Sequence, residues 1–289
     1  MSKIPEDAIQ CLDKGFVRLV DSMGGDEAIV QAARVSYGKG TTKLSQDRGL
    51  IRYLMRHRHT TPFEMVEFKF HCKMPIFVAR QWVRHRTANI NEYSLRYSEA
   101  RDEFYYPDPE HIQFQSALNK QGRMGDVPDD LKKKVQDYFK EISNRSFEIY
   151  SELNTAGVSR ELARAILPVN LYTEWYWKND LHNLLHFVGL RSDSHAQYEI
   201  RVFSDAMAES VKAVAPFAWE AYQDYVVKGM RFSKIEQNLL ERKLPDRVID
   251  DIQEDVAYQL TASLHANKPR SDEDLFPLYK DQGGSDSLD

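Results

Sequence analysis

Apolar residues recur along this chain with two different spacings, which predict short strands set among longer helices. Apolar runs and apolar–polar alternation predict strands at 12–24, 65–73 and 169–177. Apolar residues three to four positions apart predict helices at 26–38, 47–59, 75–86, 129–154, 181–191 and from 198 into the 220s. Because strands and helices do not alternate regularly, and no GxGxxG turn is present, we expect an α+β domain and not a Rossmann-type fold.

Residues 75–98 hold the densest group of chemically versatile side chains in the chain. The first half of this stretch has helical period and places Gln81 and His85 four residues apart on one edge. The predicted helix carries Arg84, His85 and Arg86 at its C-terminal end. Two guanidinium groups beside an imidazole favour an anionic ligand.

The second half of this stretch combines a carboxylate, a hydroxyl and a cation. If the backbone is extended, Glu92, Ser94 and Arg96 share one face with a period of two. This array is typical of nucleotide binding, with arginine on the phosphate and the other two groups on the sugar and base edges. The alternative is a solvated helix followed by a polar loop, although solvated faces are usually built from Lys and Glu.

The same stretch resembles the signature of the flavin-dependent thymidylate synthases, RHRxxSxNExSxRY, which the chain matches over residues 84–97. One position departs, because Asn89 stands where the pattern has its first serine, while the second serine is present as Ser94. Three further segments are similar to motifs of that family: HxTPFE at 59–64, RELARAILPVNLYT at 160–173 and LRxDxHAQ at 190–197. The resemblance covers roughly residues 12–230.

The resemblance implies the reductive methylation of dUMP to dTMP at C5 of the pyrimidine. In this family methylenetetrahydrofolate donates the carbon, and NADPH reduces FAD, which supplies a hydride. The family is homotetrameric, with active sites shared between subunits. No cysteine nucleophile is needed, which agrees with Cys11 and Cys72, because they lack CxxC spacing and Cys72 lies in an apolar strand expected to bury it.

The resemblance also assigns roles residue by residue. The flavin would be bound by Thr61, Arg84, His85, Arg86, Glu92, Asp180, His182 and His186. The nucleotide would be bound by Gln81, Arg84, Glu92, Ser94, Leu95, Arg96, Arg164 and Arg191. His59 and Glu64 would lie near the flavin. The candidate catalytic residues are Arg191, which would favour the ionised pyrimidine, and Ser94. Because Ser94 has no adjacent base in the sequence, we expect it to bind and not to attack.

Composition and charge narrow the class of ligand. The chain has 289 residues, of which 42% are hydrophobic and 29% charged, as is ordinary for a globular enzyme. The segment 233–289 has a net charge of −6, so residues 1–232 carry +1 of the formal −5. A nearly neutral body with a local arginine cluster suits an anionic small molecule better than a nucleic acid. Without an apolar run near the ~20 residues of a membrane span, or a secretory segment, we expect no membrane partner and a cytoplasmic location.

We expect one flavin-dependent thymidylate synthase domain over residues 1–232 and a separate extension over 233–289. The extension has helical patterns at 234–242 and 246–260, followed by an acidic Gly/Ser tail that we expect to be disordered. The polar, glycine-containing segment 115–128 predicts a mobile loop.

The residues leave three alternative interpretations of the chain open. A flavin-dependent RNA methyltransferase would need a basic stripe, which the charge distribution does not show. A non-catalytic nucleotide- or flavin-binding protein is favoured only by Asn89, the one departure from the signature. His182 and His186 have the HxxxH spacing of zinc ligands, but the glutamate of HExxH is missing and only His195 offers a third ligand, so no metal is predicted.

Overall fold

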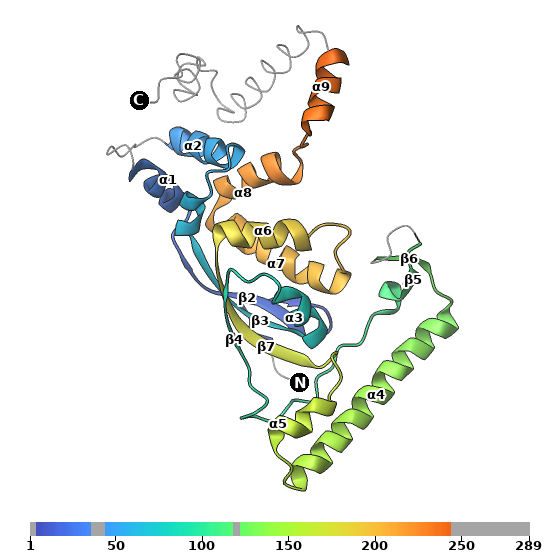
Figure 1. The fold of residues 1–289 in the computed structure, drawn as a ribbon. Helices are drawn as coiled ribbons and strands as arrows, with labels where there is room; N and C mark the ends of the chain where they lie inside the picture. The colour runs from blue at the N-terminus through green and yellow to red at the C-terminus, as the bar shows by residue number, and fades with distance from the viewer. Residues whose placement is uncertain (1–3, 36–43, 118–121, 244–289) are drawn as a thin grey trace. The chain divides into compact units, whose positions relative to one another are not determined.

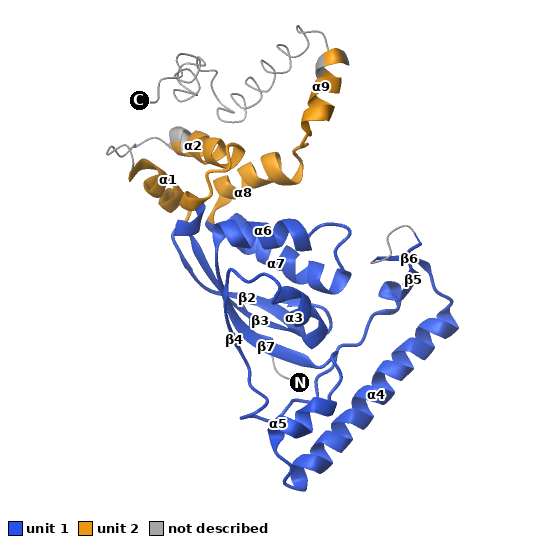
Figure 2. Ribbon diagram, viewed as in Figure 1, with its two compact units in different colours: residues 1–24, 63–214 blue, residues 25–62, 215–289 orange. Residues whose placement is uncertain are grey.

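The structure is a computed structural model that describes residues 4–35, 44–117 and 122–243. The chain forms two compact units, which Figure 2 colours separately: residues 1–24 with 63–214, and residues 25–62 with 215–289. Each unit therefore joins segments that lie far apart in the sequence. The predicted domain boundary between residues 232 and 233 stays a prediction.

An antiparallel sheet of five strands organises the first unit (Figure 1). The order across the sheet is β1-β2-β3-β7-β4. The strands are β1 Ile9–Cys11, β2 Gly15–Met23, β3 Glu67–Pro75, β7 Tyr172–Asp180 and β4 Asn89–Glu92. Because β7 pairs with β3 on one side and with β4 on the other, it joins the signature stretch to the middle of the sheet.

One face of this sheet carries the aromatic core. Phe70 and Trp177 are register partners in β3 and β7, and neither side chain is exposed. Three helices of the first unit pack with the sheet and with one another: α3 Ile76–Trp82, α6 Leu181–Arg191 and α7 Tyr198–Val214. Trp82 of α3 meets the rings of Trp175 and Trp177 edge-on, with ring centroids 5.3 Å and 5.5 Å away. Full burial of large apolar side chains stabilises a fold by roughly 1.5–3 kcal/mol each, so this cluster holds α3 on the sheet.

The other elements of the first unit include a long helix and a hairpin (Figure 1). They are the 3₁₀ turn η3 Pro109–His111, the hairpin strands β5 Gln113–Gln115 and β6 Arg123–Asp126, α4 Asp129–Thr155, α5 Arg160–Ala163 and the 3₁₀ turn η4 Arg164–Ile166. The helix predicted at 129–154 is confirmed as α4. The loop predicted at 115–128 is wrong where it is described, because β6 pairs with β5. The residues of both strands are exposed or half-buried, so no apolar alternation marked them.

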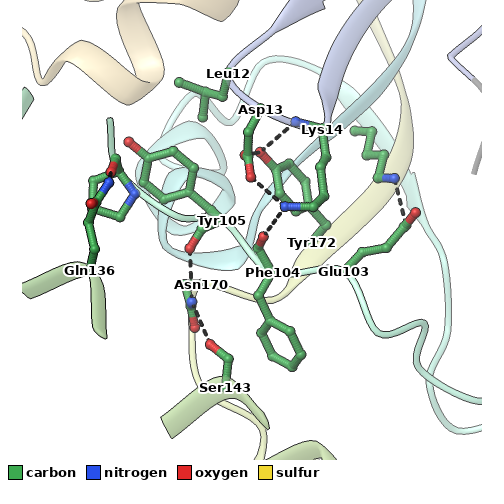
Figure 3. A network of polar contacts seen from close by, with 12 residues as sticks. Leu12, Asp13, Lys14, Glu103, Phe104, Tyr105, Gln136, Ser143, Asn170 and Tyr172 are labelled. Carbon is green, nitrogen blue, oxygen red and sulfur yellow. Dashed lines mark hydrogen bonds and ion pairs between the residues drawn. The ribbon is translucent and has the colours of Figure 1, made fainter. Parts of the chain in front are cut away.

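A polar network ties the turn between β1 and β2 to β7 (Figure 3). The Tyr172 hydroxyl donates a hydrogen bond of 2.6 Å to Asp13, and Asp13 also pairs with Lys14. Burial and the neighbouring Asp13 carboxylate raise the pKa of Tyr172. Nearby, Lys73 of β3 pairs with Glu103 at 2.6 Å, with side chains only 3% and 6% exposed. Two buried charges are tolerable here because each neutralises the other.

Gly15 begins β2 at a point of close approach between strands. A Cβ atom at this position would lie 2.7 Å from the carbonyl oxygens of Cys11 and Lys73, and 2.9 Å from the ring of Phe203. Such distances are far inside van der Waals contact, so only glycine lets β2 pass between its neighbours here.

The second unit is helical in the residues that the structure describes. Its elements are α1 Asp26–Arg34, α2 Leu44–Arg56, α8 Pro216–Tyr222, the π-helical turn η5 Gln223–Val227 and α9 Lys234–Lys243. The 3₁₀ turn η2 Thr61–Met65 contains the junction of the two units. The Asp26 carboxylate accepts from the backbone N–H groups of Phe217 and Ala218, at 2.8 Å and 2.9 Å, and so caps α8. Arg52 of α2 pairs with Glu220 of α8 and with Asp224 of η5.

The predicted α+β class is confirmed by these elements. The helix expected at 234–242 is observed as α9, whereas the helix expected at 246–260 and the acidic tail lie outside the described residues. The long helix expected from residue 198 into the 220s is divided near Pro216 into α7 and α8. Within the described ranges, no helix is both long and apolar enough to cross a membrane.

The pair Lys73–Glu103 provides a test of the core. In a Glu103→Gln variant the buried ammonium loses its carboxylate, so we expect the free energy of unfolding to fall by about 3 kcal/mol. The double variant Lys73→Met/Glu103→Gln removes both charges and should recover most of that loss. Urea unfolding followed by circular dichroism measures both effects. Equal stability of the single variant and the native protein would contradict the importance of this pair.

Candidate active site

The signature stretch leaves α3 earlier than the sequence predicted. The helix ends at Trp82. The Val83 N–H still bonds four residues back, whereas the next two N–H groups bond three residues back, from Arg84 to Gln81 at 3.4 Å and from His85 to Trp82 at 2.9 Å. Arg84, His85 and Arg86 therefore lie in the connection between α3 and β4, and the predicted helix over 75–86 is too long. The tighter turn redirects the chain so that β4 can pair with β7.

The expected extended array of Glu92, Ser94 and Arg96 is also wrong. The strand β4 ends at Glu92, and the N–H groups of Tyr97 and Ser98 both donate to the carbonyl of Ser94, at 3.2 Å and 3.1 Å. This turn separates the three side chains. The turn also ends the pairing of β4 with β7, which extends only from Asn89 to Glu92.

The turn brings the predicted phosphate-binding arginines to the same short helix. Arg96 pairs with Glu161 of α5 at 3.2 Å, and both side chains are more than half exposed. Arg164 begins η4 directly after α5, and its Nε donates to the backbone carbonyl of Glu161 at 3.4 Å. Glu92 accepts a hydrogen bond of 2.7 Å from Thr173 of β7. Two guanidinium groups thus lie around one exposed acidic residue.

Arg191 and His85 form the contact at the centre of the site. Arg191, the last residue of α6, donates from Nε to Nε2 of His85 at 3.0 Å and from Nη2 to the backbone oxygen of Gln81 at 3.4 Å. The His85 ring meets Phe187 edge-on, with a centroid distance of 4.9 Å, and lies 5.9 Å from the His186 ring. Residues from α3, its following turn and α6 are therefore brought together.

The charge state of His85 follows from its surroundings. Burial, the Arg191 guanidinium and His186 lower the pKa of His85 to about 4. Burial also lowers the pKa of Arg191. Because arginine can only donate, Nε2 of the neutral His85 ring is the acceptor and Nδ1 carries the hydrogen. The positive charge of Arg191 is then met by a neutral partner, and no carboxylate pairs with it among the described residues.

The N-terminus of α6 is fixed to the signature turn by amide and carboxylate groups. Asp180 caps the helix by accepting from the Asn183 N–H at 2.9 Å, and its second oxygen accepts from the Asn183 side chain at 2.7 Å. Asn183 in turn accepts from Thr87 at 2.7 Å. His182 is half-buried on the same helix. Asp180 thus caps the helix predicted at 181–191, and neither Asn183 nor Thr87 was among the predicted site residues.

Gln81 contacts Gln197, which was not among the predicted site residues. Its Nε2 donates to Oε1 of Gln197 at 2.5 Å, so the end of α3 is joined to the loop before α7. Gln197 is the last residue of the segment 190–197, and the resemblance of this segment to a family motif could have marked Gln197 as a site residue. Its contact with Gln81 joins positions 116 residues apart and has no local pattern.

Thr61 and His59 belong to the second unit, whereas Glu64 belongs to the first. Thr61 begins η2 with an exposed side chain, and His59 stacks on Tyr53 with a ring-centroid distance of 5.9 Å. The expected contacts of these residues with a flavin stay predictions.

The thiols are unsuited to nucleophilic attack. Cys11 and Cys72 are both free and buried. Burial raises the pKa of Cys11 to about 12 and raises that of Cys72 well above its ordinary value. Because the thiolate is the nucleophilic form, neither residue is poised for covalent catalysis. This agrees with the expectation that the chain needs no cysteine nucleophile.

Two cavities lie in the first unit beside the site, with volumes of about 440 Å³ and 640 Å³. The smaller is bordered by the β5–β6 hairpin and the loop before α7, and the larger by α4 and residues 105–113. Gln197 and Arg123 border both. Neither cavity includes a residue of 84–97, many of whose side chains, such as those of Arg84 and Arg86, are exposed.

Comparison with known proteins identifies the family. Residues 18–217 match the family model described as thymidylate synthase complementing protein. The chain is 52% identical over 257 residues to a flavin-dependent thymidylate synthase of Rickettsia conorii, covering 84% of this chain and 87% of that protein. A flavin-dependent thymidylate synthase of Ehrlichia ruminantium, strain Gardel, is 58% identical over 223 residues, which are 77% of this chain and 75% of that protein.

A solved structure agrees with this assignment. The UMP/dUMP methylase PolB of Streptomyces cacaoi, crystallised with 5-Br dUMP, superimposes with a TM-score of 0.68 at 34% identity. The match covers 74% of this chain and 97% of that protein. The α+β unit with its arginine-rich turn is thus that of an enzyme. The chain belongs to the thymidylate synthase complementing protein family, and the predicted resemblance to the flavin-dependent thymidylate synthases is confirmed.

The low pKa of His85 predicts a pH dependence of stability. The unfolded chain binds a proton at this residue near pH 6.5, while the folded protein resists it until about pH 4, so stability should fall between these values as the pH is lowered. A His85→Gln variant, whose amide oxygen can still accept from Arg191, should lose part of this fall. Melting temperatures at about pH 7 and about pH 4.5 measure the difference.

A His195→Gln variant is the matched control, because that side chain is 78% exposed. It should follow the native protein at both pH values. If the His85 and His195 variants lose stability equally on acidification, His85 is not the group responsible.

Proposed function

We propose that this enzyme methylates dUMP at C5 to form dTMP, with methylenetetrahydrofolate as the carbon donor and with FAD and NADPH supplying the reducing equivalents. The observation that carries the proposal is the contact between Arg191 and neutral His85. A half-buried guanidinium held by a neutral partner keeps its charge available for an anionic ligand. Methylation at C5 needs electron density on the pyrimidine, and a cation beside the ring favours its ionised form.

The nucleotide is held by Gln81, Arg84, Glu92, Ser94, Leu95, Arg96, Arg164 and Arg191. The placement of Arg96 and Arg164 around Glu161 supports a phosphate site at this point. The oxygens of a phosphate dianion can replace the Glu161 carboxylate at Arg96 and the Glu161 backbone carbonyl at Arg164, so a phosphate can compete for both guanidinium groups. The PolB structures, bound to 5-Br dUMP and 5-Br UMP, show that a similar fold takes this class of ligand.

The flavin is held by Thr61, Arg84, His85, Arg86, Glu92, Asp180, His182 and His186. Arg84 and Arg86 fit the pyrophosphate of FAD, because both are exposed and neither makes an ion pair within the described part of the chain. A flavin bound by these residues would supply hydride-transfer chemistry, with NADPH as the source of the hydride. The neutral His85 accepts from Arg191 at Nε2, which orients its ring next to Phe187 and His186 and leaves the Nδ1–H group as a donor for a ligand.

The active enzyme is a homotetramer with shared sites, in the cytoplasm. Two features support the sharing. The residues of the signature turn line neither of the two cavities, and several of them, including Arg84, Arg86 and Glu92, are exposed within one chain. A second copy that covers this turn would exclude water from the reaction and complete the binding surface.

The spectrum of the purified protein tests this function. We expect flavin absorption near ~450 nm that bleaches when NADPH is added without oxygen, because the flavin is reduced. Addition of dUMP and methylenetetrahydrofolate should then yield dTMP, measured as release of tritium from [5-³H]dUMP. A protein that binds dUMP and FAD without tritium release is the non-catalytic alternative and contradicts the proposal.

Arg191→Leu is the informative variant in the same assay. It should keep the flavin spectrum and lose roughly a hundredfold or more in dTMP formation, since it removes the charge beside the pyrimidine. Arg145→Leu is the matched control, because Arg145 is an exposed arginine of α4 paired only with Glu148 three residues on. Equal activity of the two variants would exclude the role of Arg191.

Ser94 should act in binding and not as a nucleophile. Its Oγ accepts from the Arg96 N–H at 3.3 Å, and no histidine or carboxylate contacts it among the described residues. A Ser94→Ala variant should raise KM for dUMP about fivefold and change kcat by less than about threefold, because one hydrogen bond is lost. Steady-state kinetics with varied dUMP decide this, since loss of a nucleophile would instead lower kcat by roughly 10⁴-fold or more.

A further inference from the structure

Glu199 is a buried carboxylate beside the site that the functions assigned so far do not use. It lies in the first turn of α7 and is only 3% exposed. Three donors from separate segments converge on it: the Tyr105 hydroxyl at 3.0 Å, the Arg123 guanidinium of β6, and Nε2 of Gln197 at 2.8 Å. Burial of a carboxylate is costly unless such donors satisfy it.

The acceptor-only character of Glu199 determines the orientation of two amides. A carboxylate cannot donate, so Gln197 must turn its NH₂ group toward Glu199. The carbonyl oxygen of Gln197 then points the other way, where it accepts from Nε2 of Gln81 at 2.5 Å. Gln81 is thereby required to donate to Gln197. Its own carbonyl oxygen stays available as an acceptor, and no described residue donates to that oxygen.

This chain of hydrogen bonds ends at the pyrimidine-binding residues. Gln81 is in the last turn of α3, and its backbone carbonyl accepts from Arg191 at 3.4 Å. The free oxygen of its side chain therefore belongs to the same group of residues as Arg191 and His85. Because Arg123 also donates to the backbone of His111 at 2.6 Å, Glu199 connects the β5–β6 hairpin to this group as well.

We propose that Glu199 is a positioning residue, which acts through Gln197 to hold the side-chain carbonyl of Gln81 as a hydrogen-bond acceptor for the bound nucleotide. The identity of that nucleotide as dUMP rests on the proposed function. On a pyrimidine deoxynucleotide, the matching donor is the sugar 3′-hydroxyl or, in the neutral base that binds before Arg191 favours its ionisation, the ring N3–H. A ligand that offers neither gains nothing from the arrangement.

The first test is a Glu199→Gln variant of the full-length protein. An amide at this position can donate, so both Gln197 and Gln81 are free to turn over, and Gln81 then presents NH₂ to the nucleotide. We expect the dissociation constant for dUMP, measured by titration calorimetry, to rise about tenfold. Glu209→Gln on the same helix is the control, because Glu209 is exposed and pairs only with Lys212; its affinity should be unchanged.

The decisive test exchanges the carboxylate at position 199 and the amide at position 197. In Glu199→Gln/Gln197→Glu, the carboxylate moves to position 197, where it accepts from the new amide and from Gln81 together. The acceptor orientation of Gln81 is then restored, so affinity for dUMP should return to within about threefold of native. The melting temperature without ligand should fall in the single variant and recover in the double one. A residue that merely packs would show no such rescue.

Two analogues identify the donor on the nucleotide. One is N3-methyl-dUMP, which lacks the ring N–H, and the other is 2′,3′-dideoxyuridine monophosphate, which lacks the 3′-hydroxyl. The analogue that binds equally to native and Glu199→Gln protein is the one that lacks the donor. A tenfold difference that persists with both analogues would overturn the acceptor role of Gln81.

Failure of this inference can be told from failure of the proposed function. If the native protein does not bind dUMP, the proposed function is wrong, and the melting temperatures of the single and double variants still decide whether Glu199 orients the amides. If dUMP binds natively but the double variant is as weak as the single one, the positioning role of Glu199 is overturned while the function stands.

Discussion

The packing of Trp82 is the interaction on which the arrangement of the site depends. Its side chain is fully buried and meets the rings of Trp175, Trp177, Phe187 and Phe203, which come from β7, α6 and α7. A helix of seven residues is too short to be stable by itself, so α3 keeps its direction through this contact. The residues on either side of Trp82 supply both the amide and the imidazole of the site.

The sequence predicts those residues of the site that lie close together along the chain. The signature over residues 84–97 is contiguous, and so is the segment 190–197, so both could be recognised without knowing how they meet. The helix that carries Arg191 and the cap at Asp180 follow from apolar spacing and a capping residue, and the structure has both. The contact between Arg191 and His85 joins positions 106 residues apart, so it depends on tertiary contacts such as the packing of Trp82 against Phe187 and has no local sequence pattern.

The features that the sequence did not predict depend on the tertiary structure around each residue. Glu92 ends its strand because the chain turns at Ser94, whose carbonyl accepts from the N–H groups of Tyr97 and Ser98, so the period-two pattern up to residue 96 was misleading. The strand β6 is polar because it is exposed, which leaves no apolar alternation to detect. Glu199 is the strongest case, since a glutamate in a helix is usually solvated, and its burial depends on Tyr105 and Arg123 from distant segments as well as on Gln197 two residues before it.

The close approach of backbone atoms at Gly15 restricts the register in which β2 can pair with its neighbouring strands. The gap between the carbonyls of Cys11 and Lys73 admits a residue without a side chain and no other. If β2 slid by one position along β3, Lys14 or Phe16 would enter that gap and be rejected. The glycine therefore favours the observed register of β2, because a shift by one position would place a side chain against these two backbone carbonyls.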